Sequence, residues 1–332
     1  MILELRTELV EGRTVIPKVG KVVESGRVHR PYFVLDGHGV AVDAVTQYLR
    51  DLALNDNSAD TCRSYGYDLL RWFRLLWLLD VGWEKATESE VSTMVGWLRT
   101  APNPQRRRLR PDSPPAGSVN LKTGKLYLPP GYAPRTINHA LTVVHGFYDF
   151  HCSFGRGPVT NPVPANKDRR SALAHRSPLE AKQQYRRARL RQKVPKAAPR
   201  SIPDGQWDEL AASLNCDRDR ALMECYVSSG ARAKELLGIE LDDVDWHGQR
   251  IYVVSKGTRE REPVPASPEA FLLLAAYLEE AGLPKPGEKL WRTQHGQVKA
   301  LTYSGMRRML QRVNARLGTN WTLHDVRHIV SA

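Results

Sequence analysis

A basic segment divides this chain into two stretches with different patterns. Twelve lysines and arginines but only two acids lie between Lys167 and Arg200. The run Asn161–Pro164, which contains two prolines and precedes this segment, is typical of the end of a regular structure. A chain of 332 residues is long enough for two domains that each bury their own core. We therefore expect one domain on each side of a basic linker at residues 166–200.

The stretch at residues 41–165 has the periodicity of a helical domain. Its first apolar residues recur at spacings of three and four, as one face of a helix requires; they are Val45, Tyr48, Leu49 and Leu52. Three more helices are predicted, at residues 58–79, 88–98 and 134–150. The last of them begins at Pro134, because proline suits the first turn of a helix. Four helices predict one all-α unit.

Two parts of the first half depart from this helical pattern. Residues 1–40 predict an N-terminal extension of short strands and turns, in which residues 32–35 form the best strand. Residues 101–134 are rich in proline and arginine and predict a loop insertion. Within that insertion, residues 120–126 can close a small hairpin.

The stretch at residues 201–332 predicts a mixed α and β domain. Helices are expected from Asp204 and in two short segments, 218–227 and 231–237. Extended pieces follow at residues 242–245, 250–254 and 260–264, separated by turn residues, and further helices complete the chain. The predicted fold is therefore mainly α with a small antiparallel β-sheet, in two domains.

Composition and spacing argue against several classes of protein. Apolar runs such as Phe271–Leu278 are far shorter than the roughly 20 residues that a membrane helix needs, so no membrane span is expected. The first residues lack the pattern of a signal peptide. The four cysteines are widely spaced and form no C-x-x-C pair, which predicts neither a zinc site nor a disulfide framework; they are Cys62, Cys152, Cys216 and Cys225. A reducing cytoplasm is the expected compartment.

Two further motifs fail on spacing. Three histidines of one predicted helix, His139, His145 and His151, are six residues apart and point to different faces, so no metal site is predicted. The segment Gly117–Lys125 lacks the spacing and the Ser or Thr of a P-loop, so no nucleotide site is expected.

The charge of the chain predicts a polyanionic partner. The formal net charge is +13, and it is concentrated in the linker and in a second cluster. That cluster consists of Arg106, Arg107, Arg108 and Arg110. Such concentration favours contacts with nucleic-acid phosphates, although a solvated basic linker has the same composition.

Four chemically active residues lie at the edges of predicted elements. Arg232 begins a short helix just after Gly230, where free backbone amides favour an anion. Lys256 lies at the tip of a predicted hairpin. His324 and Arg327 are three residues apart, so on a helix they share a face and can contact one phosphate together. Taken singly, each also fits an ordinary surface position.

The joint pattern of these residues resembles the tyrosine recombinases, also called phage integrases. Ser229–Leu237 resembles the first arginine box of that family, and Ser255-Lys256-Gly257 resembles its lysine hairpin. Thr322–His328 resembles its H-x-x-R box, in the same order and spacing. The first half is similar to the family's helical core-binding domain. The resemblance implies a two-domain clamp that closes around DNA.

The resemblance also implies a mechanism and a role for each residue. A tyrosine attacks a DNA phosphodiester, forms a 3′-phosphotyrosyl link and releases a 5′-hydroxyl. Arg232 and Arg327 would bind the charged non-bridging oxygens, which guanidinium groups match well. Lys256 would protonate the leaving oxygen, and Glu235 would orient the site. His324 would hydrogen-bond the phosphate or help to manage the proton of the nucleophile. Neither a cofactor nor a nucleotide nor a metal is needed.

The expected partner is double-stranded DNA, with a homotetramer in the intact synaptic complex. Basic residues of the insertion and the linker are the expected backbone contacts, with two arginines on the outer face of a helix at residues 304–317. They are Arg106, Arg107, Arg108, Arg186, Arg187, Arg308 and Arg312.

The nucleophile is the part of the family pattern that these residues lack. In the family, a His or Trp and then the tyrosine follow the H-x-x-R box by a few tens of residues, whereas only His328–Ala332 follow here. We expect a C-terminally truncated recombinase that binds DNA without cleaving it. A non-catalytic remnant that occupies DNA sites and a type IB topoisomerase remain the alternatives.

Overall fold

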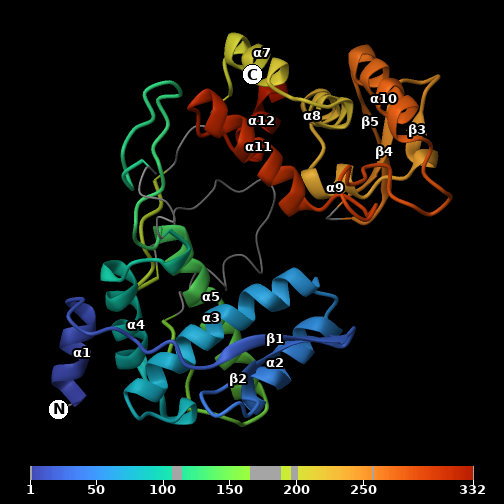
Figure 1. Ribbon diagram of the computed structural model, residues 1–332. Coiled ribbons are helices and arrows are strands. Elements are labelled where there is room, and N and C mark those ends of the chain that lie inside the picture. Colours follow the sequence, from blue (N-terminus) through green and yellow to red (C-terminus); the bar gives the residue numbers. More distant parts are fainter. Residues whose placement is uncertain (1, 107–113, 165–187, 196–200, 256–257, 332) are drawn as a thin grey trace, which may run out of the picture. The chain divides into compact units, whose positions relative to one another are not determined.

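The computed structural model describes residues 2–106, 114–164, 188–195, 201–255 and 258–331 (Figure 1). The chain forms two compact units. Unit 1 contains residues 1–117 and 128–195, and unit 2 contains residues 118–127 and 196–332. The short segment 118–127, which we expected to belong to the first domain as part of its insertion, therefore packs with the second unit.

Unit 1 is built on helices α2 (Asp43–Leu54), α3 (Ala59–Leu78), α4 (Glu88–Thr100) and α5 (Pro134–Ser153). These agree with the four predicted helices to within a few residues. Helix α3 begins where the side chain of Ser58 accepts a hydrogen bond from the backbone of Thr61. Helix α4 begins with a reciprocal cap between Thr87 and Glu90.

The core of unit 1 is rich in aromatic rings at the contact of α3 with α5. Trp72 and Phe147 are fully buried, and Phe147 packs edge-on against Phe73 at 5.8 Å between ring centroids. The buried Trp72 donates to the hydroxyl of Tyr148 at 3.1 Å, and that hydroxyl donates to the carbonyl of Trp83 at 2.9 Å. The polar atoms of these rings are therefore satisfied inside the core.

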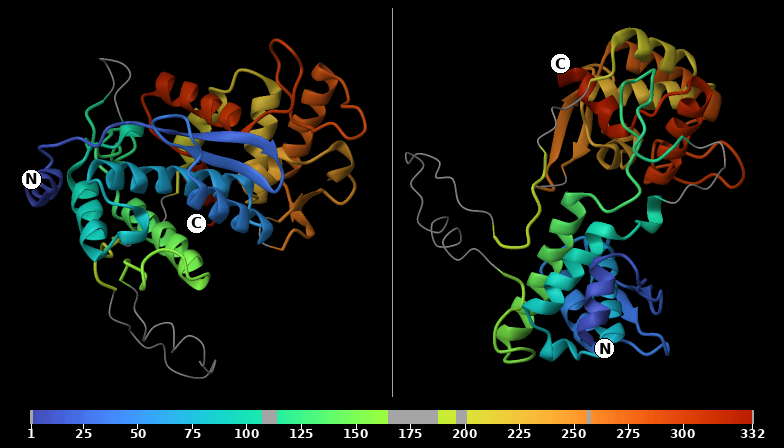
Figure 2. Two further views of the ribbon diagram at one scale, coloured as in Figure 1. Left: turned by 90° about the horizontal axis from the view of Figure 1, so that it is seen from below. Right: turned by 90° about the vertical axis from the view of Figure 1, so that its left-hand side faces the viewer.

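The first forty residues of unit 1 differ from the prediction. Residues Ile2–Val10 form helix α1, where we expected strands and turns. Leu9 is fully buried against α4, and Arg6 forms an ion pair with Glu90, so tertiary contacts stabilise this short helix. The expected strands follow as the hairpin of β1 (Lys21–Arg27) and β2 (Arg30–Leu35), which packs on α2 and α3 (Figure 2).

Unit 2 combines helices with one small sheet. Its first helices are α7 (Asp204–Ala212), α8 (Asp217–Ser229) and α9 (Ala233–Leu237). Strands β3 (Val244–Asp245), β4 (Arg250–Val254) and β5 (Arg261–Pro265) form an antiparallel sheet in that order. The bounds of β4 agree with the prediction. Strand β3 is shorter than predicted, because residues 241–243 form a 3₁₀ turn instead.

Three helices end unit 2: α10 (Pro268–Ala281), α11 (Tyr303–Leu317) and α12 (Leu323–Arg327). Helix α10 packs along α8. Helix α11 buries one face, formed by Met306, Met309, Leu310 and Val313, as its sequence periodicity predicted. Residues 328–331, which we expected to continue a helix, form a 3₁₀ turn. Among the residues that the structure describes, every helix is too short or too polar to span a bilayer.

Candidate active site

Arg232 follows a turn that only a few residue types adopt easily. Helix α8 ends because Gly230 takes a left-handed conformation, with φ of 62° and ψ of 9°. The chain then reverses, and Arg232 becomes the N-cap of α9. The turn thus fixes the position of Arg232 at the exposed junction of two helices.

Glu235 holds Arg232 in place from one turn further along α9. Its carboxylate accepts 2.7 Å from the guanidinium of Arg232 and 2.8 Å from the backbone amide of the same residue. The side chain of Glu235 is 8% exposed, whereas that of Arg232 is 51% exposed. The buried acid therefore orients an arginine that still faces solvent, which is the arrangement expected for an anion-binding residue.

Arg327 reaches the same turn from the end of the chain. Its Nε donates 2.7 Å to the carbonyl oxygen of Gly230, across a sequence separation of 97 residues. Within the described residues, the terminal nitrogens of Arg327 form no hydrogen bond or ion pair. The contact places a half-buried guanidinium against the backbone two residues before Arg232. The two predicted arginine motifs therefore meet at one turn.

His324 lies on α12 with Arg327, as the three-residue spacing predicted. Its ring is exposed, and its Nε2 lies 3.2 Å from the Nε2 of His328. The two rings pack edge-on, with 4.4 Å between their centroids. His328 therefore contacts the ring of His324 on α12.

Tyr226 connects α8 with α12 from inside the core. Its side chain is 3% exposed, and its hydroxyl donates 2.8 Å to the carbonyl of Leu323. Burial raises the pKa of Tyr226 to about 12, although the nearby charge of Arg327 opposes this shift. A buried, hydrogen-bonded phenol of this kind stabilises the core and is a poor nucleophile.

Several predicted site residues lie outside the described residues. These are Lys256, Arg107, Arg108, Arg186 and Arg187. The ends of β4 and β5 on either side of Lys256 are joined by a hydrogen bond of 2.9 Å from the amide of Ser255 to the carbonyl of Glu260. The backbone of Arg106 lies in a 3₁₀ turn at Pro104–Arg106. Arg308 and Arg312 are exposed on α11, as predicted.

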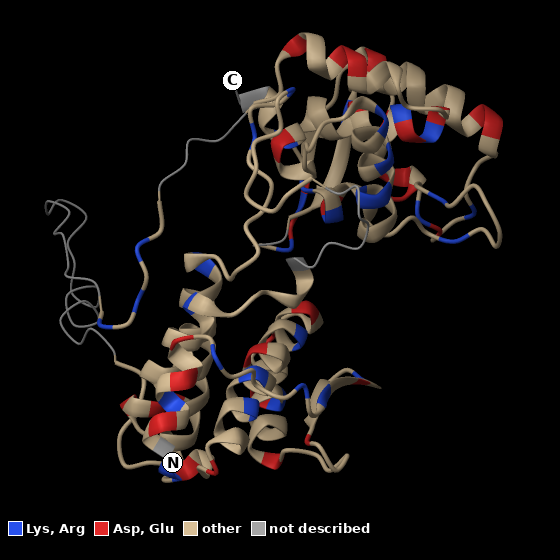
Figure 3. Cartoon of the chain, turned by 60° about the vertical axis from the view of Figure 1, so that its left-hand side comes forward, with Lys and Arg blue, Asp and Glu red and all other residues tan. Residues whose placement is uncertain are grey.

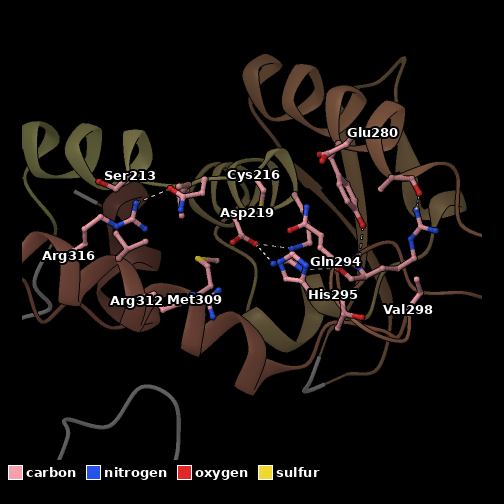
Figure 4. A pocket seen from close by; sticks show the side chains of 18 residues that line it. Ser213, Cys216, Asp219, Glu280, Gln294, His295, Val298, Met309, Arg312 and Arg316 are labelled. Atoms are coloured by element: carbon pink, nitrogen blue, oxygen red, sulfur yellow. Dashed lines mark hydrogen bonds and ion pairs between the residues drawn. The ribbon is translucent and has the colours of Figure 1, made fainter. Parts of the chain in front are cut away.

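Charges of both signs are interspersed over the described surface of each unit (Figure 3). One cavity of about 710 Å³ gathers several arginines in unit 2 (Figure 4). Arg312 and Arg316 line it from α11, and Arg316 donates 2.8 Å to the side chain of Asn215. The cavity lies at the N-terminal end of α8, beside Cys216 and Asp219. It is separated from Gly230 by the length of this 13-residue helix, about 20 Å. The cavity and the Arg232 site are therefore distinct.

Two family models match the chain. The phage integrase family matches residues 206–332, which include Arg232, His324 and Arg327. The N-terminal SAM-like domain of phage integrases matches residues 45–108 in unit 1. The chain belongs to the phage integrase family of tyrosine recombinases. The predicted family is thus confirmed for both halves of the sequence.

Similar proteins agree with this family. Tyrosine recombinase XerD of Yersinia pestis is 34% identical over 92 residues, which are 26% of this chain and 30% of the relative. The match therefore spans less than a third of that curated relative.

Among solved structures, a lambda integrase (75-356) dimer bound to a COC′ core site has a TM-score of 0.55 at 16% identity, covering 87% of this chain and 84% of that chain. A lambda integrase tetramer bound to a Holliday junction gives the same score and identity, with 87% and 71% covered. These likenesses confirm the predicted fold class.

Three features of the site were missed by the sequence reasoning. The carbonyl of Gly230 anchors Arg327, and His328 contacts His324. Helix α12 also begins with a reciprocal cap between Thr322 and Asp325. The spacing of that cap is a recognisable signal for the start of a helix, so this feature was readable from the sequence. The Gly230 contact is long-range and has no local signal.

Proposed function

We propose that this chain is the DNA-binding and phosphate-activating part of a site-specific DNA recombinase or integrase. The observation that supports this most directly is the hydrogen bond from Arg327 to the carbonyl of Gly230, which brings the H-x-x-R motif to the turn that carries Arg232. Two guanidinium groups that share one turn and face solvent suit a phosphodiester whose charge increases in the transition state. Membership of the phage integrase family gives this arrangement its reaction.

The proposed reaction is strand transfer through a protein-linked phosphate. A tyrosine hydroxyl loses its proton as its oxygen bonds to the scissile phosphorus. The bond from phosphorus to the 5′-oxygen breaks, and the leaving 5′-oxygen takes up a proton, so the number of protons is conserved. We assign Arg232 and Arg327 to the non-bridging oxygens, Lys256 to proton donation, and His324 to a hydrogen bond with the phosphate. Glu235 acts through Arg232, because its buried carboxylate fixes that side chain. Rejoining is the reverse reaction with the hydroxyl of another strand.

Among these 332 residues, no tyrosine follows the H-x-x-R box and could act as the nucleophile. Only five residues follow Arg327, and none is a tyrosine. We therefore propose that the 332-residue chain by itself binds duplex DNA but forms no covalent link to it.

The proposed partner is double-stranded DNA, with assembly into a tetramer when recombination sites are paired. The lambda integrase structures, a dimer on a core site and a tetramer on a Holliday junction, support this by likeness of fold. We assign backbone contacts to the basic linker with Arg186 and Arg187 and to Arg308 and Arg312 on α11. All four cysteines are free thiols, which fits a reducing cytoplasm.

The test is a DNA-binding and cleavage experiment on the 332-residue chain. We expect affinity for duplex DNA to fall steeply as salt rises, because phosphate contacts release condensed counterions. We expect no covalent adduct on a nicked suicide substrate. Binding that does not respond to salt would contradict the phosphate contacts, and a covalent adduct would contradict the absence of a nucleophile.

A matched pair of variants tests the site itself. We expect Arg327→Gln to weaken binding of inorganic sulfate, because it removes one of the two guanidinium groups. Arg220→Gln is the control, because Arg220 is an exposed arginine near the other end of α8, where it pairs with Asp217. Equal sulfate affinity for the two variants would contradict an anion site at Arg327.

A further inference from the structure

A hairpin from the first half of the chain is built into unit 2. Residues 118–127 lie between two parts of unit 1 in the sequence, but they pack with residues of unit 2. Val119 and Leu126 pair in antiparallel fashion, and the backbone amide of Asn120 donates 2.9 Å to the carbonyl of Lys125. Gly124 takes a left-handed φ of 62° that closes the turn. The segment is therefore an ordered hairpin, as its sequence predicted.

Asn120 fixes the shape of this hairpin and attaches it to unit 2. Its side-chain oxygen accepts from the amides of Lys122 and Thr123, each at 3.0 Å. Its amide nitrogen donates 2.9 Å to the carbonyl of Gly318, at the end of α11. Asn120 is 5% exposed, so these bonds are made away from water and are costly to lose.

The hairpin also contacts the connection between α11 and α12. The hydroxyl of Thr123 donates to the side chain of Asn320, and the Asn320 amide donates 3.1 Å to the carbonyl of Lys125. Beyond these bonds, the ammonium group of Lys125 forms an ion pair with Asp325. The hairpin therefore binds the segment that leads into α12, the helix that carries His324 and Arg327.

Asp325 connects the hairpin with the site, because it pairs with Lys125 and lies in α12. Its carboxylate accepts 2.7 Å from the amide and 2.6 Å from the hydroxyl of Thr322, which forms the N-terminal cap of α12. The side chains of Asp325 and Lys125 are 12% and 22% exposed. Burial alone would raise the pKa of Asp325, but the hydrogen bonds from Lys125 and Thr322 outweigh it and lower the pKa below 3.8. The carboxylate therefore stays charged, and the ammonium group of Lys125 is one of the groups that keep its pKa low.

We propose that Lys125 is a positioning residue of the phosphate site, which acts by neutralising the buried carboxylate that caps α12 and so fixes His324 and Arg327. This inference rests on the proposed function of those two residues. Asp325 lies between them in the sequence, one residue after His324 and two before Arg327. A shift of the cap moves both side chains together, because they belong to a helix of five residues. An unpaired buried carboxylate would favour such a shift.

The experiment measures sulfate binding at the site in the full 332-residue chain. Inorganic sulfate is the probe, because it is a tetrahedral oxyanion that keeps its charge at neutral pH. Binding is followed by the NMR signal of the His324 ring, assigned with His324→Gln, at constant ionic strength. Lys125→Met keeps the length of the side chain and removes its charge. Lys125→Arg restores the charge.

Lys122→Met is the matched control from the same hairpin. Lys122 has a side chain that is 56% exposed and lies 3.7 Å from Glu209, so it makes a solvent-exposed ion pair. We expect Lys125→Met to shift the His324 signal and to weaken sulfate binding roughly threefold to thirtyfold, the range typical of residues that act through a neighbour. Lys125→Arg and Lys122→Met should both bind sulfate as the unmodified chain does.

The outcomes separate this inference from the proposed function. Unchanged sulfate binding and an unchanged His324 signal in Lys125→Met would overturn the positioning role and leave the phosphate site standing. A His324 signal that ignores sulfate in the unmodified chain would overturn the phosphate site itself, and the inference with it. If Lys125→Met fails to fold, the double variant Lys125→Met with Asp325→Asn removes both charges. That variant should fold and bind sulfate, and its failure to bind while folded would contradict neutralisation as the mechanism.

Discussion

Replacing Gly230 with alanine should destabilise unit 2 through backbone strain alone. Gly230 has a φ of 62°, in the left-handed region, and a Cβ added there would meet no atom within 4 Å. Packing therefore contributes nothing to the cost. A left-handed conformation costs an L-residue roughly 1–2 kcal/mol. Alanine also restricts the unfolded chain, which returns about 0.4–1 kcal/mol, so the net loss should be roughly 1 kcal/mol.

Gly205→Ala is the control that isolates the strain. Gly205 lies in helix α7 with an ordinary φ, and a Cβ there would also meet no atom within 4 Å. Both variants gain the same restriction of the unfolded chain, so it cancels in their difference. Gly205→Ala should stabilise unit 2 by about 0.4–1 kcal/mol. The two variants should therefore differ by roughly 1–2 kcal/mol, which is the strain itself.

The assay is urea unfolding followed by hydrogen exchange of peptides from α8, which reports on unit 2 separately from unit 1. Gly230→Asn should fall between the two alanine variants, because asparagine enters the left-handed region more easily than alanine does. Equal stability of Gly230→Ala and Gly205→Ala would refute the reasoning. It would mean that the turn after α8 is not held in the left-handed conformation that presents the Gly230 carbonyl to Arg327.

Two further predictions concern hydrogen bonds in which one partner is buried. Tyr226→Phe should lower the free energy of unfolding of unit 2 by about 1–2 kcal/mol, because the buried carbonyl of Leu323 loses its donor. Urea unfolding measures this loss, and the control is Tyr252→Phe, at a half-buried tyrosine of β4 whose ring lies under the guanidinium of Arg261. A loss no larger than that of the control would contradict the prediction. His139 donates a hydrogen bond from its ring Nδ1 to the carboxylate of Asp68, and this bond raises the pKa of His139 above 6.5. The contribution of His139 to stability is therefore fully present below pH 6.5 and is lost as the pH rises through the folded pKa. The measurement compares the unfolding free energies of His139→Gln and the unmodified chain between pH 5 and 9, about the range in which His titrates. The difference between the two should shrink as the pH rises. A difference that stays constant with pH would contradict the prediction.

Local patterns predicted much of the fold. The apolar spacing in α11 identified its buried face, and the turn residues on either side of residues 250–254 gave the bounds of β4. These signals are local, because helix and strand faces repeat within a few residues. The prediction of strands and turns for residues 2–10 was wrong, because helix α1 is stabilised by the burial of Leu9 and by the ion pair of Arg6 with α4. Both contacts are made with residues distant in the sequence, so the local pattern does not indicate them.

The sequence predicted the main residues of the candidate site but not the contacts that support them. The family pattern identified Arg232, His324 and Arg327, and the structure brings Arg327 to the turn before Arg232. The supporting contacts came from distant segments and were not predicted. The ion pair between Lys125 and Asp325 spans 200 residues, and nothing near Lys125 in the sequence indicates its partner.

The hairpin at residues 118–127 determines which fragments of this protein retain the contacts of α12. A fragment that begins after the basic linker would carry α12 but lack Lys125, which lies far upstream. A chimera that joins residues 201–332 to the helical half of another recombinase would face the same mismatch, unless the donor half supplied an equivalent lysine. The unit that can be transferred therefore consists of two segments of the chain, residues 118–127 and 196–332, which pack together although they are distant in the sequence. Exchange of the C-terminal unit between relatives should succeed only when the hairpin is transferred with it.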